Sequence, residues 1–296
     1  MRMKTIEFAG LNIVLHPHSA ERYCDLFDSV AELCPTTPTA VWGSFHGMLR
    51  FLSPLNRANR LGGYNGVALK FVITDPGLPY VELATADYRE PTEDIPSPIP
   101  KDFGVNARQC SFHFDPIRHF LVYDVKALSV RQAVTLFESI FERPDIVEKF
   151  GEVSVRPVSS SGAIEHIFEV PKIKSVYFDV SQPNPDQLTG LQDELVKRLV
   201  ATNTGRLRET HTASSSKGEG IKPDEHMRAL SRLSLMNGET KVNFTNQLGK
   251  SDSRSTKDRP LRQKFEYNPE FMGEHAAVVS NAPDLYSDCG EDGIDE

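Results

Sequence analysis

Serine, histidine and aspartate residues lie close together at one place in the sequence, which makes them the first candidates for catalytic chemistry. Ser111, His113 and Asp115 alternate along a predicted strand, so their side chains share one face of it. A hydrolytic triad needs a base within hydrogen-bond reach of the nucleophile, whereas side chains two residues apart on a strand point in parallel. We therefore expect His113 and Asp115 on a solvated sheet face and assign no catalytic residues.

Histidine pairs are the second candidate, this time for a metal site. His16 and His18 are two residues apart, and His113 and His119 flank a predicted turn, but no carboxylate or cysteine stands at a ligand spacing. The glycine-rich stretch 62–66 leads into a strand and lacks the lysine of a phosphate-binding loop, which favours a hairpin loop. A nuclease would need converging acids, and the acids here form no pattern. We expect no metal and no cofactor.

Basic side chains are concentrated in the second half of the chain. Residues 197–264 carry 15 basic and 7 acidic side chains, whereas residues 1–196 carry 18 and 25, and residues 265–296 carry none and 9. Such a cluster suits phosphate neutralisation. The arginines expected to bind RNA or DNA are Arg206, Arg208, Arg228, Arg232, Arg259 and Arg262, followed by a flexible arm that adds Lys250, Arg254, Lys257 and Lys264.

Three hypotheses about function remain open at this point. The first is nucleic-acid binding through residues 197–264; its alternative is a solvated face whose charges pair with the acidic tail. The second is a partner-dependent effector or enzyme of nuclease or toxin type, with a concave site assembled from distant residues. The third is an interaction scaffold that binds a basic protein through the acidic residues 265–296.

The clearest structural unit is residues 173–200, which predict a strand, a corner and a helix. Apolar and polar residues alternate from Ile173 to Val180. Asn184 is a good N-cap and Pro185 suits the first helical position. Leucines then follow at helical spacing, at Leu188, Leu191, Leu195 and Leu199.

The first half of the chain predicts a mixed arrangement of strands and helices. Residues 5–16 read as a strand, a helix capped by Ser19 extends to Leu33, and strands follow at 41–52 and 67–74, an order typical of half a ferredoxin-like fold. A hairpin over 109–125, a helix with a Ser129–Gln132 capping box, and a short strand and helical turn at 153–158 and 164–168 complete this part.

The fold class that follows is α+β, with a mixed, mainly antiparallel sheet, helices mainly on one face and a disordered tail. Residues 1–248 form the globular region, with a sub-boundary near 86–106, where an acidic, proline-rich segment reads as a long surface loop. A helix over 223–236 and a strand over 241–245 end it, and residues 249–296 form a flexible basic-then-acidic tail.

Composition and motif content favour a cytoplasmic location. The four cysteines show no paired spacing, which favours reduced thiols. No apolar run approaches the length of about 20 residues that a membrane helix needs, so we expect no membrane association. The oligomeric state stays open.

Three short motifs in the chain resemble an uncharacterised prokaryotic family, domain of unknown function 4747. They are IPKDFGVN (99–106) before a hairpin, PNPD (183–186) before a leucine-striped helix, and SLMNG (234–238). The resemblance covers most of residues 1–248. It implies a bacterial or phage protein of the kind found among mobile-element and phage-defence genes, and it transfers no catalytic residue.

Overall fold

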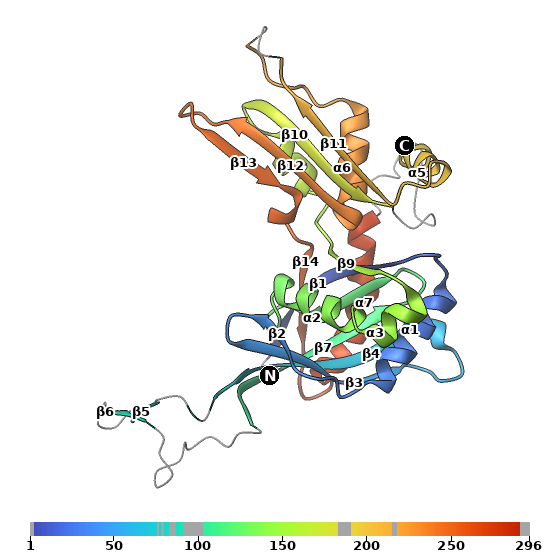
Figure 1. The fold of residues 1–296 in the computed structure, drawn as a ribbon, viewed down its shortest axis with the longest axis vertical. Helices are drawn as coiled ribbons and strands as arrows, with labels where there is room; N and C mark the ends of the chain where they lie inside the picture. The colour runs from blue at the N-terminus through green and yellow to red at the C-terminus, as the bar shows by residue number, and fades with distance from the viewer. Residues whose placement is uncertain are drawn as a thin grey trace.

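The computed structural model describes residues 3–75, 77, 80–82, 87–90, 103–182, 191–214 and 218–290. It is an α+β fold with two main antiparallel sheets, each with helices packed on it (Figure 1). We call the larger sheet with its helices the large lobe and the smaller one the small lobe. The expected fold class, α+β with a mainly antiparallel sheet, is confirmed.

The large sheet has the strand order β14-β1-β8-β7-β4-β3-β2, and β9 also pairs with β1 beyond the end of β14. Both faces of this sheet are covered, so a central strand such as β1 is buried along nearly all of its length. The bounds are β1 Lys4–Leu15, β2 Thr39–Trp42, β3 Phe45–Pro54, β4 Tyr64–Ile73, β7 Gly104–Asp115, β8 Phe120–Asp124, β9 Val153–Pro157 and β14 Arg262–Tyr267.

The expected succession of strand, helix, strand and strand is present as β1, α1 (Ala20–Glu32), β3 and β4. In a ferredoxin-like half, the first and last of these strands would pair. Here the β7–β8 hairpin lies between β4 and β1, so they are not neighbours. The strand expected over 41–52 is divided into β2 and β3 by a turn at Gly43, whose φ of 54° suits glycine.

Helices cover both faces of the large sheet. On one face, α1, α2 (Val130–Phe141) and α3 (Pro144–Phe150) pack over a core that includes Leu11, Phe112 and Leu121. On the other face, α7 (Glu274–Gly290) covers Phe8, Phe120 and Val122. The expected caps Ser19 and Ser129 are confirmed, the second as a complete capping box.

The small sheet has the strand order β11-β10-β12-β13, with every pair antiparallel. Val176, Phe178 and Val180 of β10 are fully buried beneath the helices of this lobe, which confirms the predicted alternation. The bounds are β10 Lys172–Ser181, β11 Arg206–Thr212, β12 Gly238–Thr245, β13 Ser251–Ser255, α4 Ala163–Phe168, α5 Leu191–Ala201 and α6 Glu225–Asn237, with the short 3-10 helices η1 Arg60–Gly62 in the large lobe and η3 Thr256–Asp258 here.

The chain enters the small lobe after Val158 and returns to the large sheet at Leu261, so the lobes do not follow the expected division at residue 248. The boundary at residue 249 is wrong, because β13, η3, β14 and α7 follow it. Polar edge strands and a small-residue helix gave too weak an apolar signal to predict them. Residues 291–296 lie outside the described residues, and disorder there stays a prediction.

Two further expectations fall largely on residues outside the described ranges. The Asn184–Pro185 corner lies there, although α5 confirms the helix that was expected to follow it. Most of the acidic, proline-rich segment lies there too. The described residues beside it form a short two-stranded pair, β5 Tyr80–Glu82 with β6 Asp87–Arg89.

Candidate functional site

The six arginines expected to bind nucleic acid do not share one surface. Arg206 and Arg208 lie on β11, Arg228 and Arg232 on α6, and Arg259 directly after η3, all in the small lobe. Arg262 lies on β14 of the large sheet, 3.6 Å from Glu7 of β1. The other five form two groups in the small lobe, the two arginines of β11 and the three arginines of α6 and η3.

The two arginines of β11 share one carboxylate on the adjacent strand. Both Nε and Nη2 of Arg206 donate to the Asp179 carboxylate at 2.6 Å, and Arg208 Nε lies 3.4 Å from the same group. The hydrogen-bonded Arg206 guanidinium holds the pKa of Asp179 below its usual value. This pair is therefore partly neutralised, although the Arg208 side chain is 60% exposed.

A cluster of arginines surrounds the short helix α4. The Arg228 guanidinium lies over the Phe168 ring at 5.6 Å, and Arg254 Nη1 donates to the His166 carbonyl at 2.7 Å. The Arg259 carbonyl accepts hydrogen bonds from Ser160, just before α4. Arg232 is exposed one helical turn beyond Arg228. We call Arg228, Arg232, Arg254 and Arg259 the α4 arginine cluster.

The α4 arginine cluster is not neutralised by side chains in the described ranges. No described carboxylate oxygen lies within 4.0 Å of these four guanidiniums, in contrast to Arg60, Arg118, Arg143, Arg206 and Arg262, which all have one. Burial lowers the pKa of His166, and the positive charges of Arg254 and Arg259 lower it further, against a smaller opposite effect of Asp258. Arg254 and Arg259 thus place positive charge beside α4, which itself carries the exposed Glu165 and ends at the exposed Glu169.

Local sequence explains why α6 presents its arginines outward. Asp224 caps the helix by accepting from the Met227 N–H at 2.8 Å. Met227, Leu230 and Leu233 follow at helical spacing and are buried, which leaves Arg228 and Arg232 on the opposite face. The predicted helix and its inward residues are confirmed. Arg254 had been assigned to a flexible arm, because β13 consists of polar residues only.

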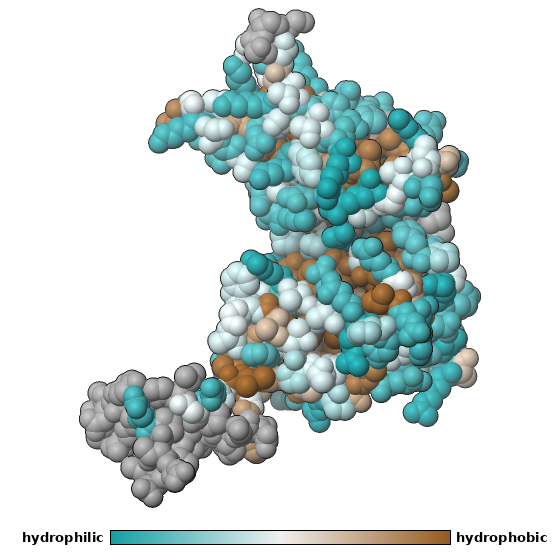
Figure 2. Space-filling view, in the orientation of Figure 1, coloured by the Kyte–Doolittle hydropathy of each residue, from teal (hydrophilic) through white to brown (hydrophobic). Residues whose placement is uncertain are grey.

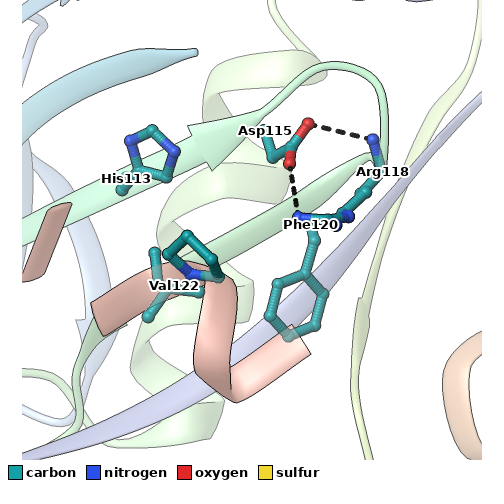
Figure 3. A pocket seen from close by; sticks show the side chains of 7 residues that line it. His113, Asp115, Arg118, Phe120 and Val122 are labelled. Atoms are coloured by element: carbon teal, nitrogen blue, oxygen red, sulfur yellow. Dashed lines mark hydrogen bonds and ion pairs between the residues drawn. The ribbon is translucent and has the colours of Figure 1, made fainter. Parts of the chain in front are cut away.

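A second candidate is a shallow hollow between the β7–β8 hairpin and α7, of about 230 Å³ including space open to solvent. Figure 3 shows Asp115 and Arg118 facing each other there, 3.5 Å apart, above Phe120. Asp115 also accepts from the backbone N–H groups of Ile117 and Arg118, so it holds the hairpin turn. The hollow therefore groups titratable residues, but its ion pair has a structural role.

His113 was expected on a solvated face, and this expectation is wrong. Its side chain is 8% exposed, because α7 covers this face of the sheet. Its Nδ1 lies 2.9 Å from Asn65 Oδ1, so the imidazole pairs with an amide rather than with Ser111 or Asp115. Burial lowers the pKa of His113. His113 therefore lies in a buried polar pair with Asn65.

The histidines of the first loop and of the hairpin turn are close in space. The rings of His18 and His119 meet edge-on with centroids 4.2 Å apart, and the Tyr23 ring lies 4.4 Å from His119. Burial lowers the pKa of His16. Within the described residues, no three His, Cys, Asp or Glu are placed to hold a metal ion.

Figure 2 shows how hydrophilic and hydrophobic residues are distributed over one face of the molecule. In Figure 2, hydrophilic and intermediate residues cover most of the small lobe, whereas more hydrophobic side chains show at the large lobe and between the lobes. No helix in the described ranges combines the length and the apolar character needed to cross a membrane.

Comparison with known proteins agrees with the three sequence motifs. The model of the family "Domain of unknown function (DUF4747)" matches residues 4–282. The chain belongs to this family. The match extends through both lobes and into α7, beyond the range expected from the motifs. A search of curated proteins found no match.

Two of the DUF4747 motifs have structural roles in the described residues. SLMNG ends α6 at the junction of the lobes, where Asn12 Nδ2 donates to Asn237 Oδ1 at 2.9 Å and the Ser159 N–H donates to the Leu235 carbonyl at 2.8 Å. The end of IPKDFGVN begins β7, where a Cβ on Gly104 would lie 2.4 Å from the Phe71 ring. PNPD lies outside the described residues.

Proposed function

We propose that this DUF4747 protein binds nucleic acid through the α4 arginine cluster. The observation that carries the proposal is the convergence of four arginines without a described carboxylate partner around one short helix. Arginine forks suit phosphate oxygens, and neutralising backbone phosphates releases bound counterions. The guanidiniums of Arg228 and Arg254 each lie over an aromatic ring, at 5.6 and 5.5 Å from its centroid, which limits the freedom that binding would remove.

The positive charge is a property of this surface and not of the whole lobe. Residues 159–196 contribute two basic and six acidic side chains to the small lobe, which offsets much of the excess counted over 197–264. Because exposed charges act over about 10 Å at ordinary ionic strength, the local arrangement decides what binds. The proposal therefore concerns the face around α4 alone.

The proposal includes a cellular compartment and a genetic context. Cys24, Cys34 and Cys110 are free thiols in the structure, which supports a reducing compartment such as the cytoplasm of a prokaryotic cell. A role among mobile-element or phage-defence genes is what the family resemblance implies.

A salt titration tests the proposal. Binding of the full chain to labelled single- and double-stranded RNA and DNA is measured by fluorescence anisotropy across a salt series. We expect affinity to fall with salt, with a log–log slope of about −0.7 to −0.9 for each phosphate contact. The Arg228→Ala/Arg232→Ala variant should bind more weakly and lower the magnitude of the slope by about 1 to 2.

The matched control removes two exposed arginines from the large lobe, as Arg57→Ala/Arg108→Ala. It changes the net charge equally, so it should leave the slope close to that of the unmodified protein. Equal losses in both variants would show that only net charge matters. No binding to any of the four nucleic acids would overturn the proposal.

A further inference from the structure

The small sheet has one face on which polar side chains form ordered rows. Helices pack against the face of Val176 and Phe178, and the other face carries the alternate residues of each strand. We call this other face the open sheet face. Its cross-strand rows are Arg208–Asp179–Glu239, Thr210–Tyr177–Lys241–Ser255 and Thr212–Ser175–Asn243–Ser253.

Tyr177 is the aromatic residue of these rows and lies at their centre. Its direct neighbours are Thr210 on β11 and Lys241 on β12. Its hydroxyl donates to Asp179 Oδ2 at 3.2 Å, which fixes one end of the ring. Asn243 Nδ2 donates to Ser175 Oγ at 3.0 Å in the next row. Hydroxyl and amide groups therefore border an oriented ring.

Basic side chains are exposed on the open sheet face. Asp179 is shared by Arg206 and Arg208, and Glu239 accepts from Lys257 Nζ at 3.1 Å. Lys241 is exposed beside them. Glu152 also acts on Arg206, and Asp258 accepts from the Ser255 N–H, so the accessible positive charge is that of Arg208 and Lys241, which suits a phosphate and not a basic partner.

The α4 arginine cluster lies on the helix-covered side of the same sheet, and η3 contacts both α4 and the strand β12. Lys257 of η3 reaches Glu239 on the open sheet face, and Arg259 of the cluster follows two residues later. Lys257 and Arg259 are both exposed, so η3 is the segment over which an extended, negatively charged chain would connect the two basic regions. A sheet face with one oriented ring suits an unpaired base, because a duplex keeps its base faces stacked and hidden.

We propose that the open sheet face binds single-stranded nucleic acid, with a base stacked on Tyr177 and the adjoining phosphates on Arg208 and Lys241. This inference rests on the proposed function and specifies its substrate class. The hydroxyl and amide groups beside Tyr177 contact base edges or sugars.

The test uses the full chain with 12-nucleotide single strands of RNA and DNA and a duplex of the same sequence. Tyr177→Ala should weaken single-strand binding by about 5- to 150-fold, the range for loss of one base–aromatic stack. Tyr177→Phe retains the ring and should bind nearly as well as the unmodified protein. Phe271→Ala removes an aromatic side chain that is 80% exposed elsewhere and is the matched control.

The outcomes separate this inference from the proposed function. Single-strand binding that depends on Arg228 and Arg232 but not on Tyr177 would overturn the inference and leave the proposed function standing. Tighter binding of the duplex than of both single strands would also overturn it. No binding by the unmodified protein would overturn both. A selective loss in Tyr177→Ala supports it, and the RNA and DNA arms then show which strand is preferred.

Discussion

Gly238, the first residue of β12, should tolerate no side chain. A Cβ built on it would lie 1.8 Å from the Asp179 carbonyl oxygen, 2.9 Å from the Asp179 carbonyl carbon and 3.1 Å from Val180 Cα. All three atoms belong to the backbone of the adjacent strand β10, so no rotamer change can relieve the contact. The φ of 174° is ordinary extended backbone, and the requirement for glycine is purely steric.

The loss of stability in Gly238→Ala follows from the displacement of the two strands. Gly238→Ala forces β12 and β10 apart by roughly an ångström at this point, where Gly238 faces Val180 and Glu239 faces Asp179. Overpacking of this kind costs about 1–3 kcal/mol, and two weakened ladder hydrogen bonds add about 0.5–1.5 kcal/mol each. We expect a loss of about 3 kcal/mol, equivalent to a fall in Tm of about 5 °C for a chain of 296 residues.

The assay is urea and thermal unfolding followed by circular dichroism. Gly205→Ala is the matched control, because a Cβ on Gly205 meets no atom within 4 Å. The control should unfold within about 0.5 kcal/mol of the unmodified protein. Equal stability of the Gly238 and Gly205 variants would refute the steric argument and the pairing register on which it depends.

Four further predictions concern the junction, α7 and two titrating groups. Asn237→Ala removes the acceptor of Asn12 Nδ2 at the lobe junction and should cost about 1–3 kcal/mol in urea unfolding, and no change would contradict a coupling of the lobes by this bond. Ala277→Asp places an unpaired charge on the buried, sheet-facing side of α7 and should cost about 3–5 kcal/mol in urea unfolding, whereas Ala276→Asp on the exposed side of the helix should be nearly neutral. Arg206 lowers the pKa of Asp179, so the ion pair stabilises the folded protein above the unfolded pKa of about 3.9, and this stabilisation is lost as pH falls through the folded pKa. The stability difference between the unmodified protein and Arg206→Ala should therefore be larger at pH 7 than at acidic pH. A difference that does not change with pH would argue against the pair. Burial lowers the pKa of His113, so on acidification the unfolded chain binds this proton before the folded chain does, and the free energy of unfolding falls below about pH 6.5. His113→Gln should therefore reduce the change in urea midpoint between pH 7 and pH 5. An unchanged pH dependence of the midpoint would show that other groups cause it.

Local signals predicted much of this fold correctly. The alternation of Val176, Phe178 and Val180, the caps at Ser19 and Ser129, and the apolar stripe of α6 depend on nearest neighbours and on one buried face. These properties are written in a few consecutive residues, so periodicity and capping chemistry recover them. The outward direction of Arg228 and Arg232 follows from the same stripe.

Pairing between distant segments was beyond the reach of such signals. β13 and β14 are polar edge strands whose stability comes from the strand beside each of them, and α7 is docked through small residues such as Ala277 and Ala282. The return of the chain to the large sheet is what buries His113 and makes the tail part of the core.

The sequence by itself determined the fold class, most helices and strands, and the presence of a basic segment. Only the tertiary structure decided which arginines act together. It neutralised Arg262 and Arg206 with acids from distant strands, it brought Arg254 and Arg259 to α4, and it placed Tyr177 at the centre of a polar face. The physical reason is that charge pairing and surface shape depend on contacts across the sheet, which no local pattern encodes.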